Sequence, residues 1–336
     1  MNPYKTSVSK HILIVSLLLT LLLIPIMLIG LSVGSTDHST KDVLMILLGG
    51  GDTSSTLGSI IWGIRLPRVI LAVLVGAALS LGGLVFQALL HNALAEPYIL
   101  GISGGSAVGA IIGILLGFSH FRGVALCAFA GSMVTLSLVL IIVSGEMDMR
   151  KDSLILAGVM VNALCGSIIM FLISITQDSR LHSILFWLMG DLSMSDRHQV
   201  LILSATVVPC FVILFFFARP MNLLLMGEEL AANMGLSVQI TSLLLLMITS
   251  FMVSTTVCYT GLLGFVGLVI PHMLRLLLGA DHRLLIPSCI LGGGAYLVLC
   301  DMLARSVSAQ GEMPVGIITA MIGAPLFIFL LWRSRR

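Results

Sequence analysis

The sequence predicts an all-α membrane protein of about ten transmembrane helices, each of which needs roughly 20 apolar residues. Of its 336 residues, 58% are hydrophobic and 10% are charged, and the mean hydropathy is +1.14. A water-soluble domain carries about 25% charged residues, so this chain has too little polar surface to cover a soluble fold. Its apolar runs are long and continuous, which favours helices over a β-barrel, the other structure that satisfies its backbone in lipid.

The apolar runs place the spans near residues 12–33, 67–90, 98–118, 122–144, 154–175, 199–218, 238–258, 262–279, 284–303 and 315–332. Pro271, His272 and Arg275 interrupt the eighth run, so we expect a short or broken helix there. The long loop 34–66 is expected to carry a short interfacial helix at Val43–Leu48.

We interpret residues 1–336 as a single transmembrane domain with both termini on one side, because the number of spans is even. The basic residues in the tail 333–336 place that side in the cytoplasm, where positive charge accumulates beside membrane helices. The same side then holds the polar loop at about 219–239, which interrupts the apolar pattern.

A short helix is expected within this polar loop. Glu228 and Glu229 suit the N-terminus of a helix because of its dipole. Leu230 and Met234 are four residues apart and share one face, and Gly235 suits a C-terminal cap. The residues alone leave an ordinary interfacial helix as an alternative to a functional one.

Several function classes lack the residues that they need. The net charge is +2 and the cations are scattered, which gives no patch for nucleic acid. The eight histidines are dispersed without an H-E-x-x-H motif, so we expect neither an enzyme active site nor a metal site. The six cysteines stand singly in apolar runs and are interpreted as small hydrophobic residues.

The residues that would supply the energy for transport are also missing. The sequence has no G-x-x-x-x-G-K-[ST] pattern, so this chain cannot hydrolyse ATP by that route. Ion-coupled carriers need ionisable groups within their spans, and apart from Asp301 the apolar runs are nearly free of acidic residues. A permease driven by a separate ATPase is therefore favoured, with an ion-coupled secondary transporter as the alternative.

Six motifs follow one another along the chain: R-L-P-R at 65–68, N-A-L-A-E-P at 92–97, G-E-E-L-A-A-N-M-G-L at 227–236, G-F-V-G-L-V-I-P-H-M-L-R at 264–275, D-M-L-A-R at 301–305 and P-V-G-I at 314–317. In this order they resemble the iron-chelate (FecCD-type) permease family, the importers of ferric siderophores, haem and vitamin B12. The resemblance covers about residues 60–333. It departs at Ala93, where the family commonly has proline, so we expect a looser turn there.

The resemblance implies the helical bundle of a type II ATP-binding-cassette (ABC) importer permease in a bacterial inner membrane. Two ABC ATPase subunits, which hold ATP and Mg²⁺, would bind below, and a periplasmic substrate-binding protein would deliver the metal chelate from above. A second permease subunit would complete the pathway; a homodimer is the simplest arrangement, and a heterodimer stays open. This chain itself would bind no cofactor or nucleic acid, only its partners and membrane lipid, and the identity of the chelate stays open.

The resemblance also implies roles for particular residues. Coupling to the ATPase falls on residues of the polar loop, namely Gly227, Glu228, Glu229, Ala232, Met234 and Gly235. Arg65, Arg68 and Arg305, at the outer ends of their spans, would pair with carboxylates of the binding protein, the alternative being interfacial snorkelling. Asn92 and Leu94 would form a cytoplasmic gate, the alternative being a capped turn. For the charged loop 145–152 the resemblance gives only a location.

Two buried polar residues and one histidine have less specific interpretations. Gln87 and Asn162 lie within spans and would line the pathway or form interhelical hydrogen bonds. His272 follows a proline in the interrupted run and is interpreted as structural.

Overall fold

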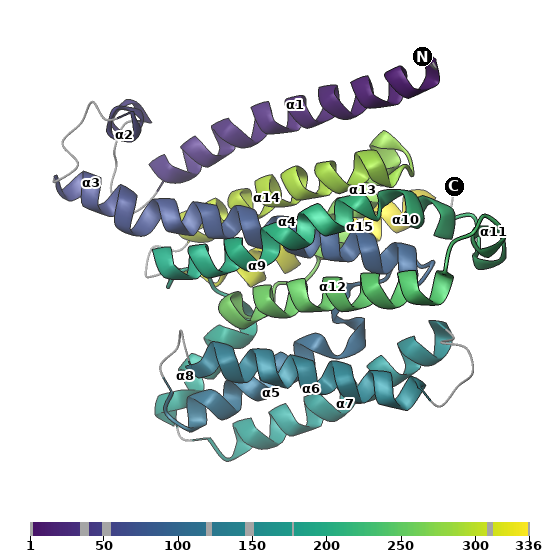
Figure 1. Cartoon of the computed structure of the whole chain (residues 1–336). Coiled ribbons are helices and arrows are strands. Elements are labelled where there is room, and N and C mark those ends of the chain that lie inside the picture. The colour runs from purple at the N-terminus through teal and green to yellow at the C-terminus, as the bar shows by residue number, and fades with distance from the viewer. Residues whose placement is uncertain are drawn as a thin grey trace.

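A computed structural model describes residues 3–33, 40–48, 55–118, 123–144, 151–176, 178–307 and 312–334, and within these ranges every regular element is a helix (Figure 1). The N-terminal elements are α1 (Pro3–Ser32), α2 (Thr40–Leu47), α3 (Thr56–Ile60), η1 (Ile61–Arg65), α4 (Leu66–Leu89), η2 (Pro97–Leu100), α5 (Ile102–Leu115), α6 (Ala125–Val143) and α7 (Lys151–Ser174). The remaining elements are α8 (Asp178–Met189), α9 (Arg197–Phe216), α10 (Ala218–Leu224), α11 (Glu228–Asn233), α12 (Val238–Thr260), α13 (Val266–Leu278), α14 (His282–Val307) and α15 (Val315–Ser334).

Among the described residues, seven helical stretches are long and apolar enough to cross a membrane, and three shorter apolar helices accompany them. Together they correspond to the ten expected spans. The broken eighth span is confirmed, because α13 starts only after the irregular segment 261–265. The helix α5, with 14 residues, is only about 21 Å long and needs η2 before it to approach the roughly 30 Å of a hydrocarbon core.

The helix α4 is the core of the bundle. With α3 and η1 it forms one continuous helical stretch of 34 residues, Thr56–Leu89, and it packs against α9, α12, α13 and α14. Two glycines allow the closest approaches. A Cβ atom on Gly76 would meet the carbonyl oxygen of Gly293 in α14, and one on Gly83 would meet that of Gly267 in α13. Small residues therefore bring these backbones together, as is typical of membrane helices.

The remaining helices form a second group beside this core. Figure 1 shows α5, α6, α7 and α8 gathered on one side of α12, and α5 packs against α6, α7 and α8. The helix α12 joins the two groups, because it packs against α4 and α9 on one side and α5 and α6 on the other.

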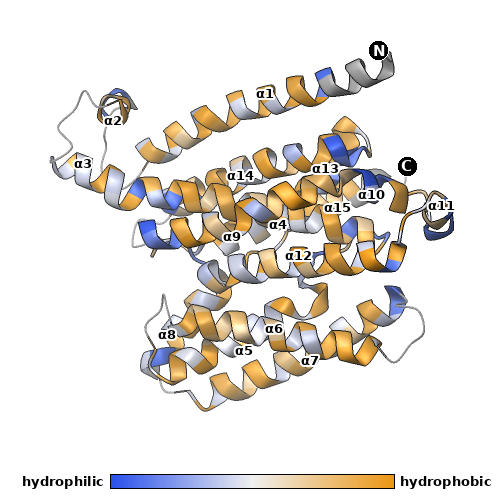
Figure 2. Cartoon of the chain, viewed as in Figure 1, coloured by the Kyte–Doolittle hydropathy of each residue, from blue (hydrophilic) through white to orange (hydrophobic). Residues whose placement is uncertain are grey.

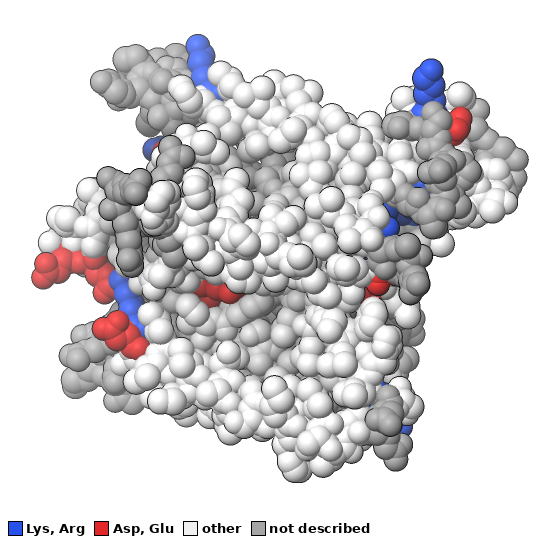
Figure 3. All heavy atoms as spheres, turned by 180° about the vertical axis from the view of Figure 1, so that it is seen from behind, with Lys and Arg blue, Asp and Glu red and all other residues white. Residues whose placement is uncertain are grey.

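The bundle has two chemically distinct ends. Both chain ends lie with α10 and α11 at one end, named here the α11 end, and α2 and α3 lie at the opposite end, the α3 end (Figure 1). Hydrophobic residues cover the helix bodies between them, and hydrophilic residues gather at the two ends (Figure 2). The view from behind shows most of the charged residues near the two ends, with a few acidic atoms within the otherwise uncharged face between them (Figure 3). The two chain ends lie at one end of the bundle, as expected for an even number of spans, and the side of the membrane on which they lie stays a prediction.

The sequence predicted only some of the short helices that connect the spans. The helix expected at Val43–Leu48 is confirmed as α2, and the one expected in the polar loop is confirmed as α11. The helices α8 and α10 were not expected. Most of the charged loop 145–152 lies outside the described residues, which resume at Lys151.

Candidate functional site

The helix α11 owes its limits to two glycines. Gly227 precedes it with φ +104°, and Gly235 follows it with φ +87°. Both angles are in the region that side chains disfavour, and open space surrounds both Cα atoms, so backbone conformation rather than crowding requires glycine. Glu228 and Glu229 occupy the first turn, where the helix dipole favours negative charge.

The exposed side of α11 combines acidic and apolar groups. Ala231 is buried and anchors the helix, whereas Glu229 and Ala232 are exposed. Leu230 and Met234 are 53% and 62% exposed, and they place apolar surface beside the acidic groups. The six residues expected to couple to the ATPase are therefore assembled on one short, protruding helix and its two flanking turns.

The turn after α4 contains the two residues expected to form a gate. Asn92 Oδ1 accepts a hydrogen bond from Leu94 N at 2.9 Å, and Asn92 O accepts one from Ala95 N at 3.0 Å. Asn92 thus closes the turn itself, in the way that asparagine commonly does, although Ala93 replaces the proline of the family pattern. Leu94 is 46% exposed at the α11 end. The capped turn is confirmed, and the gating role stays a prediction.

Two irregular segments meet between the halves of the bundle. Glu96 Oε1 accepts a hydrogen bond from Phe265 N at 3.1 Å, and the Tyr98 hydroxyl contacts both Leu263 O and Leu263 N, at 3.2 and 3.3 Å. These side chains satisfy backbone groups that a helix break leaves free, as buried backbone in a membrane protein requires. Gln87 Nε2 adds a hydrogen bond to Gly267 O at 3.3 Å. Sequence reasoning missed Glu96 and Tyr98, whose only local signal is the Glu-Pro pair.

At the α3 end the structure brings together Arg65, Arg68 and Arg305 with Asp301 and Glu312, named here the arginine network. Arg68 Nε lies 2.9 Å from Asp301 Oδ1, and its NH1 lies 2.5 Å from Glu312 Oε2. Arg305 Nε lies 3.1 Å from Asp301 Oδ2. The Asp301 carboxylate is fully buried between two cations, so each of its oxygens faces one arginine.

The same arginines close the C-terminal end of α1. Arg65 NH1 donates to Leu31 O at 2.8 Å and to Ser32 O at 3.1 Å. Arg305 donates to Val33 O at 2.7 Å and to Gly30 O at 3.0 Å. Cations suit this position because the last carbonyls of a helix lack partners within the helix.

The position of the three arginines at one end of their spans agrees with the sequence analysis, but their side chains point inward. Arg65 is 6% exposed and Arg68 3% exposed, and all three bind groups of their own chain. Exposed snorkelling is therefore wrong for Arg65 and Arg68, and pairing with another protein stays a prediction.

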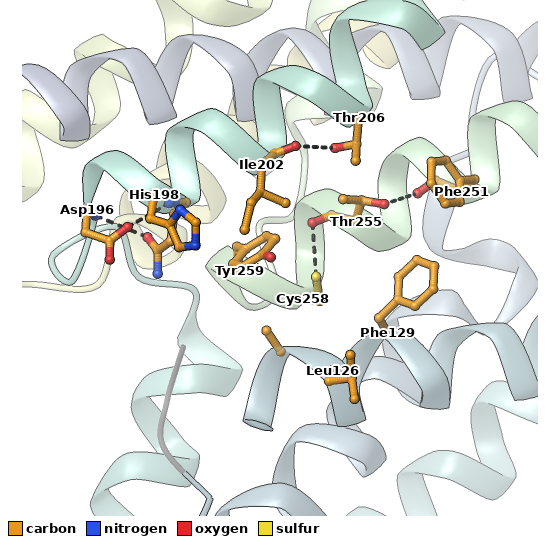
Figure 4. Close-up of a pocket in the computed structure, with 12 residues that line it drawn as sticks. Leu126, Phe129, Asp196, His198, Ile202, Thr206, Phe251, Thr255, Cys258 and Tyr259 are labelled. Atoms are coloured by element: carbon orange, nitrogen blue, oxygen red, sulfur yellow. Dashed lines mark hydrogen bonds between the residues drawn. The ribbon is translucent and has the colours of Figure 1, made fainter. Parts of the chain in front are cut away.

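A cavity of about 550 Å³ opens between α6, α9 and α12 (Figure 4). Figure 4 shows Asp196 and His198 at one end and Phe129 and Phe251 at the other, with Tyr259 between them. Asp196 caps α9, since its Oδ1 accepts from Gln199 N at 2.6 Å. The surface that lines this cavity is mostly apolar. No group of three or more potential metal ligands gathers within the described part of the chain.

The remaining residues from the sequence analysis take ordinary positions. Asn162 is exposed on α7. His272 is buried in α13, 5.9 Å from the ring of Phe327 in an edge-on contact, which agrees with a structural role.

The whole chain has counterparts among known proteins. It is 38% identical over 319 residues to the hemin transport system permease protein HmuU of Yersinia pestis, covering 92% of this chain and 94% of that protein. It is 40% identical over 289 residues to the vitamin B12 import system permease protein BtuC of Salmonella arizonae, covering 85% and 87%. A solved inward-facing structure of a transporter assigned to the metal-chelate ABC type superposes with a TM-score of 0.85 at 33% identity, covering 95% and 98%.

The fold is therefore that of a type II ABC importer permease, and the chain is a multi-pass transport protein. The family model for FecCD transport proteins matches residues 19–333, nearly the entire chain. With this match and the two relatives above, the protein belongs to the FecCD transport family.

Proposed function

We propose that the chain is the permease subunit of an ABC importer that carries a metal chelate across the bacterial inner membrane into the cytoplasm. The observation that carries this proposal is α11, a glycine-bounded helix with exposed acidic and apolar side chains at the end where both termini lie. The relatives are named for hemin and vitamin B12, so the cargo belongs to the class of ferric siderophores, haem and cobalamin.

The partners follow from this assignment. Two ABC ATPase subunits, with ATP and Mg²⁺, would dock at the α11 end, which is then cytoplasmic. A second copy of this chain would complete the pathway, as a homodimer. The chemistry of ATP hydrolysis belongs to the ATPase, and this chain contributes binding surface and motion.

The helix α11 suits docking because it offers what protein interfaces use. Leu230 and Met234 supply exposed apolar area, and Glu229 supplies a charge that fixes orientation and register. Anchored at Ala231 and bounded by Gly227 and Gly235, the helix moves as a unit when its partner moves.

We assign docking of the binding protein to the opposite, α3 end. Arg65, Arg68 and Arg305 concentrate positive charge there, and Glu312, half exposed, is the group of the network that reaches the surface beside the buried Arg68. A carboxylate of the binding protein would meet the network at this edge. Asn92 and Leu94 would then form the gate at the cytoplasmic end, with the exposed Leu94 side chain as its apolar element.

The test is charge reversal on α11. In proteoliposomes with the partner ATPase and the binding protein, Glu229→Arg should reduce ATP-dependent uptake by about tenfold or more, since rim charges and like-charge contacts decide register. The purified variant should keep the helical circular dichroism and elution volume of the wild type.

Asp42→Arg is the matched control, because Asp42 also lies exposed in the first turn of a short helix, α2, at the α3 end. Both variants lose the same dipole interaction, and only Glu229→Arg should also lose binding of the ATPase to the purified permease, a readout that does not involve the binding protein. Unchanged uptake in Glu229→Arg would contradict the docking role. Uptake that follows a proton gradient without any ATPase would favour an ion-coupled secondary transporter.

A further inference from the structure

We propose that His91 and Lys151 form a mechanical link between α11 and the turn 91–96, so that movement of the coupling helix reaches the gate directly. This inference rests on the proposed function, because it assumes that α11 receives the ATPase. It assigns positioning roles to two residues that neither the motifs nor the relatives single out.

His91 is held at both ring nitrogens. Its Nε2 lies 2.7 Å from Leu224 O, the last residue of α10, and its Nδ1 lies 2.7 Å from Lys151 Nζ. A carbonyl oxygen only accepts hydrogen bonds and an ammonium group only donates them. The ring is therefore the neutral tautomer with hydrogen on Nε2, which donates to Leu224 while Nδ1 accepts from Lys151.

Lys151 completes the connection to α11. It is the first described residue of α7, and its Nζ also lies 2.7 Å from Glu228 Oε1. An ammonium group has three donors, so one lysine can hold the histidine and the carboxylate together. The contacts thus run from Glu228 at the start of α11, through Lys151 and His91, to the end of α10.

The backbone of His91 transmits this position to the gate. His91 has φ +50°, a left-handed conformation that a non-glycine residue adopts at a cost and keeps where its surroundings fix it. The next residue is Asn92, whose N–H donates to Gln87 O at 3.2 Å and whose side chain closes the turn at Leu94. A displacement of the His91 ring therefore acts on the residue that shapes the gate turn.

A cavity of about 530 Å³ beside the link gives α11 room to move. Leu89 and Leu90 at the end of α4, Lys151, Glu228 and the first turns of α12 line this hollow. Close-packed helices resist small shifts, whereas an element next to a hollow can take a second position without overlap. Lys151 and Glu228 of the link line this hollow, and the link fixes which position the gate turn follows.

The link is suited to transmitting motion rather than to stabilising the fold. The side chains of Lys151 and Glu228 are 30% and 53% exposed, and exposed ion pairs contribute little to folding. Variants of the link should therefore assemble normally and lose coupling between ATP hydrolysis and transport.

The experiment measures the number of cargo molecules imported per ATP hydrolysed by the complete complex in proteoliposomes. Haem, cyanocobalamin and a ferric hydroxamate are tried first, and the one that the wild type imports serves as probe. Lys151→Met keeps the stem and removes the ammonium, Lys151→Arg keeps the charge, and His91→Asn keeps a residue that tolerates the left-handed backbone. Asp152→Asn, the exposed neighbour on α7, is the control for a change of one charge.

We expect ATP hydrolysis to stay within about twofold of the wild type in Lys151→Met and His91→Asn, while cargo per ATP falls by about fivefold or more, the lower range of allosteric couplings. Lys151→Arg should recover most of the ratio, and Asp152→Asn should match the wild type. A purely structural role would lower hydrolysis and uptake in proportion and leave their ratio unchanged.

A wild-type ratio in Lys151→Met, or a proportional loss of both activities, would overturn the link while leaving the importer assignment intact. If Lys151→Met fails to assemble, Glu228→Gln tests the same contact from α11 and should show the same loss of ratio. Absence of ATP-driven uptake in the wild type itself would overturn the proposed function and the link together.

Discussion

Replacing Asp301 by asparagine tests whether the arginine network holds the α3 end together. Asp301 lies in α14, fully buried, with Arg68 on one oxygen and Arg305 on the other. Asparagine has almost the same shape. It can accept a hydrogen bond from one arginine through its oxygen. Its amide nitrogen then points at the other arginine, so that two hydrogen-bond donors face each other without an acceptor. The variant therefore removes the buried negative charge that Arg68 and Arg305 share, and leaves Arg68 with Glu312 and Arg305 with carbonyl oxygens of α1 as their remaining partners.

The expected cost follows from this burial. Removing one partner of a buried, hydrogen-bonded ion pair costs about 3–5 kcal/mol, because the remaining charge stays desolvated. Arg68 is 3% exposed and the Arg305 side chain 7%, so neither cation can reach water without moving. For a chain of this length about 2 °C of melting temperature corresponds to each kcal/mol, which predicts a fall of roughly 6 °C or more.

Thiol exposure provides the assay, because five of the six cysteines are buried and become reactive on unfolding. A thiol-reactive dye, at one fixed heating rate in detergent, reports an apparent melting temperature for each variant. Glu312→Gln is the matched control. Its carboxylate contacts the same Arg68 but is 50% exposed, and such pairs contribute about 0–1 kcal/mol. A melting temperature of Asp301→Asn within about 1 °C of the wild type would refute this account of the network.

Two further predictions concern packing and pH. Gly83→Ala places a methyl group against the carbonyl oxygen of Gly267 and should lower stability by about 1–3 kcal/mol, measured as a fall in melting temperature, whereas Gly166→Ala, with open space around it, should be neutral. At Asp281, between α13 and α14, burial raises the carboxyl pKa, but hydrogen bonds, the strongest from Arg283, outweigh it and hold the pKa below its usual value. Its stabilising contribution is thus present above about pH 4 and lost as the pH falls through the lowered pKa. When the melting temperature is measured at decreasing pH, it should therefore fall less steeply below about pH 4 in Asp281→Asn than in the wild type.

The sequence predicted the elements whose signals are local. Apolar runs located the spans, because lipid requires long uninterrupted apolar segments. The helix α11 was predicted from Glu228 and Glu229 at its start and Gly235 at its end, and the structure places those residues in those positions. The broken helix at α13 was predicted from Pro271, although the irregular segment lies just before the helix rather than at the proline.

The elements that the sequence missed depend on distant contacts. The span at 98–118 was predicted, but not that its helix α5 begins only at Ile102, after a segment in which Glu96 and Tyr98 bind backbone groups at Phe265 and Leu263, more than 160 positions away. Likewise, α8 follows a span closely and carries polar residues, so the apolar pattern does not separate it from a loop. Neither the start of α5 nor the helix α8 has a signal among the residues that neighbour it in the sequence.

The sequence also could not predict the direction in which the three arginine side chains point. Their positions near the ends of spans are local facts, and these were predicted correctly. Whether Arg68 points toward a partner protein or into the bundle depends on Asp301, which is 233 positions away and packs beside it only after α4 and α14 meet. A single sequence contains no record of that contact, so the pattern predicts a charged end but not its partners.

The two ends of the bundle differ in how much energy a movement costs. At the α3 end, a displacement of α14 against α4 would separate Asp301 from Arg68 within a dry environment, at a cost comparable to that of Asp301→Asn. At the α11 end, the Lys151–Glu228 pair is exposed to water and lies beside a cavity, so its displacement costs little. Motion driven by a partner should therefore be largest at the α11 end and the turn 91–96. The helices joined by the arginine network should move together as one rigid body, as in a hinge motion in which the α3 end stays in place.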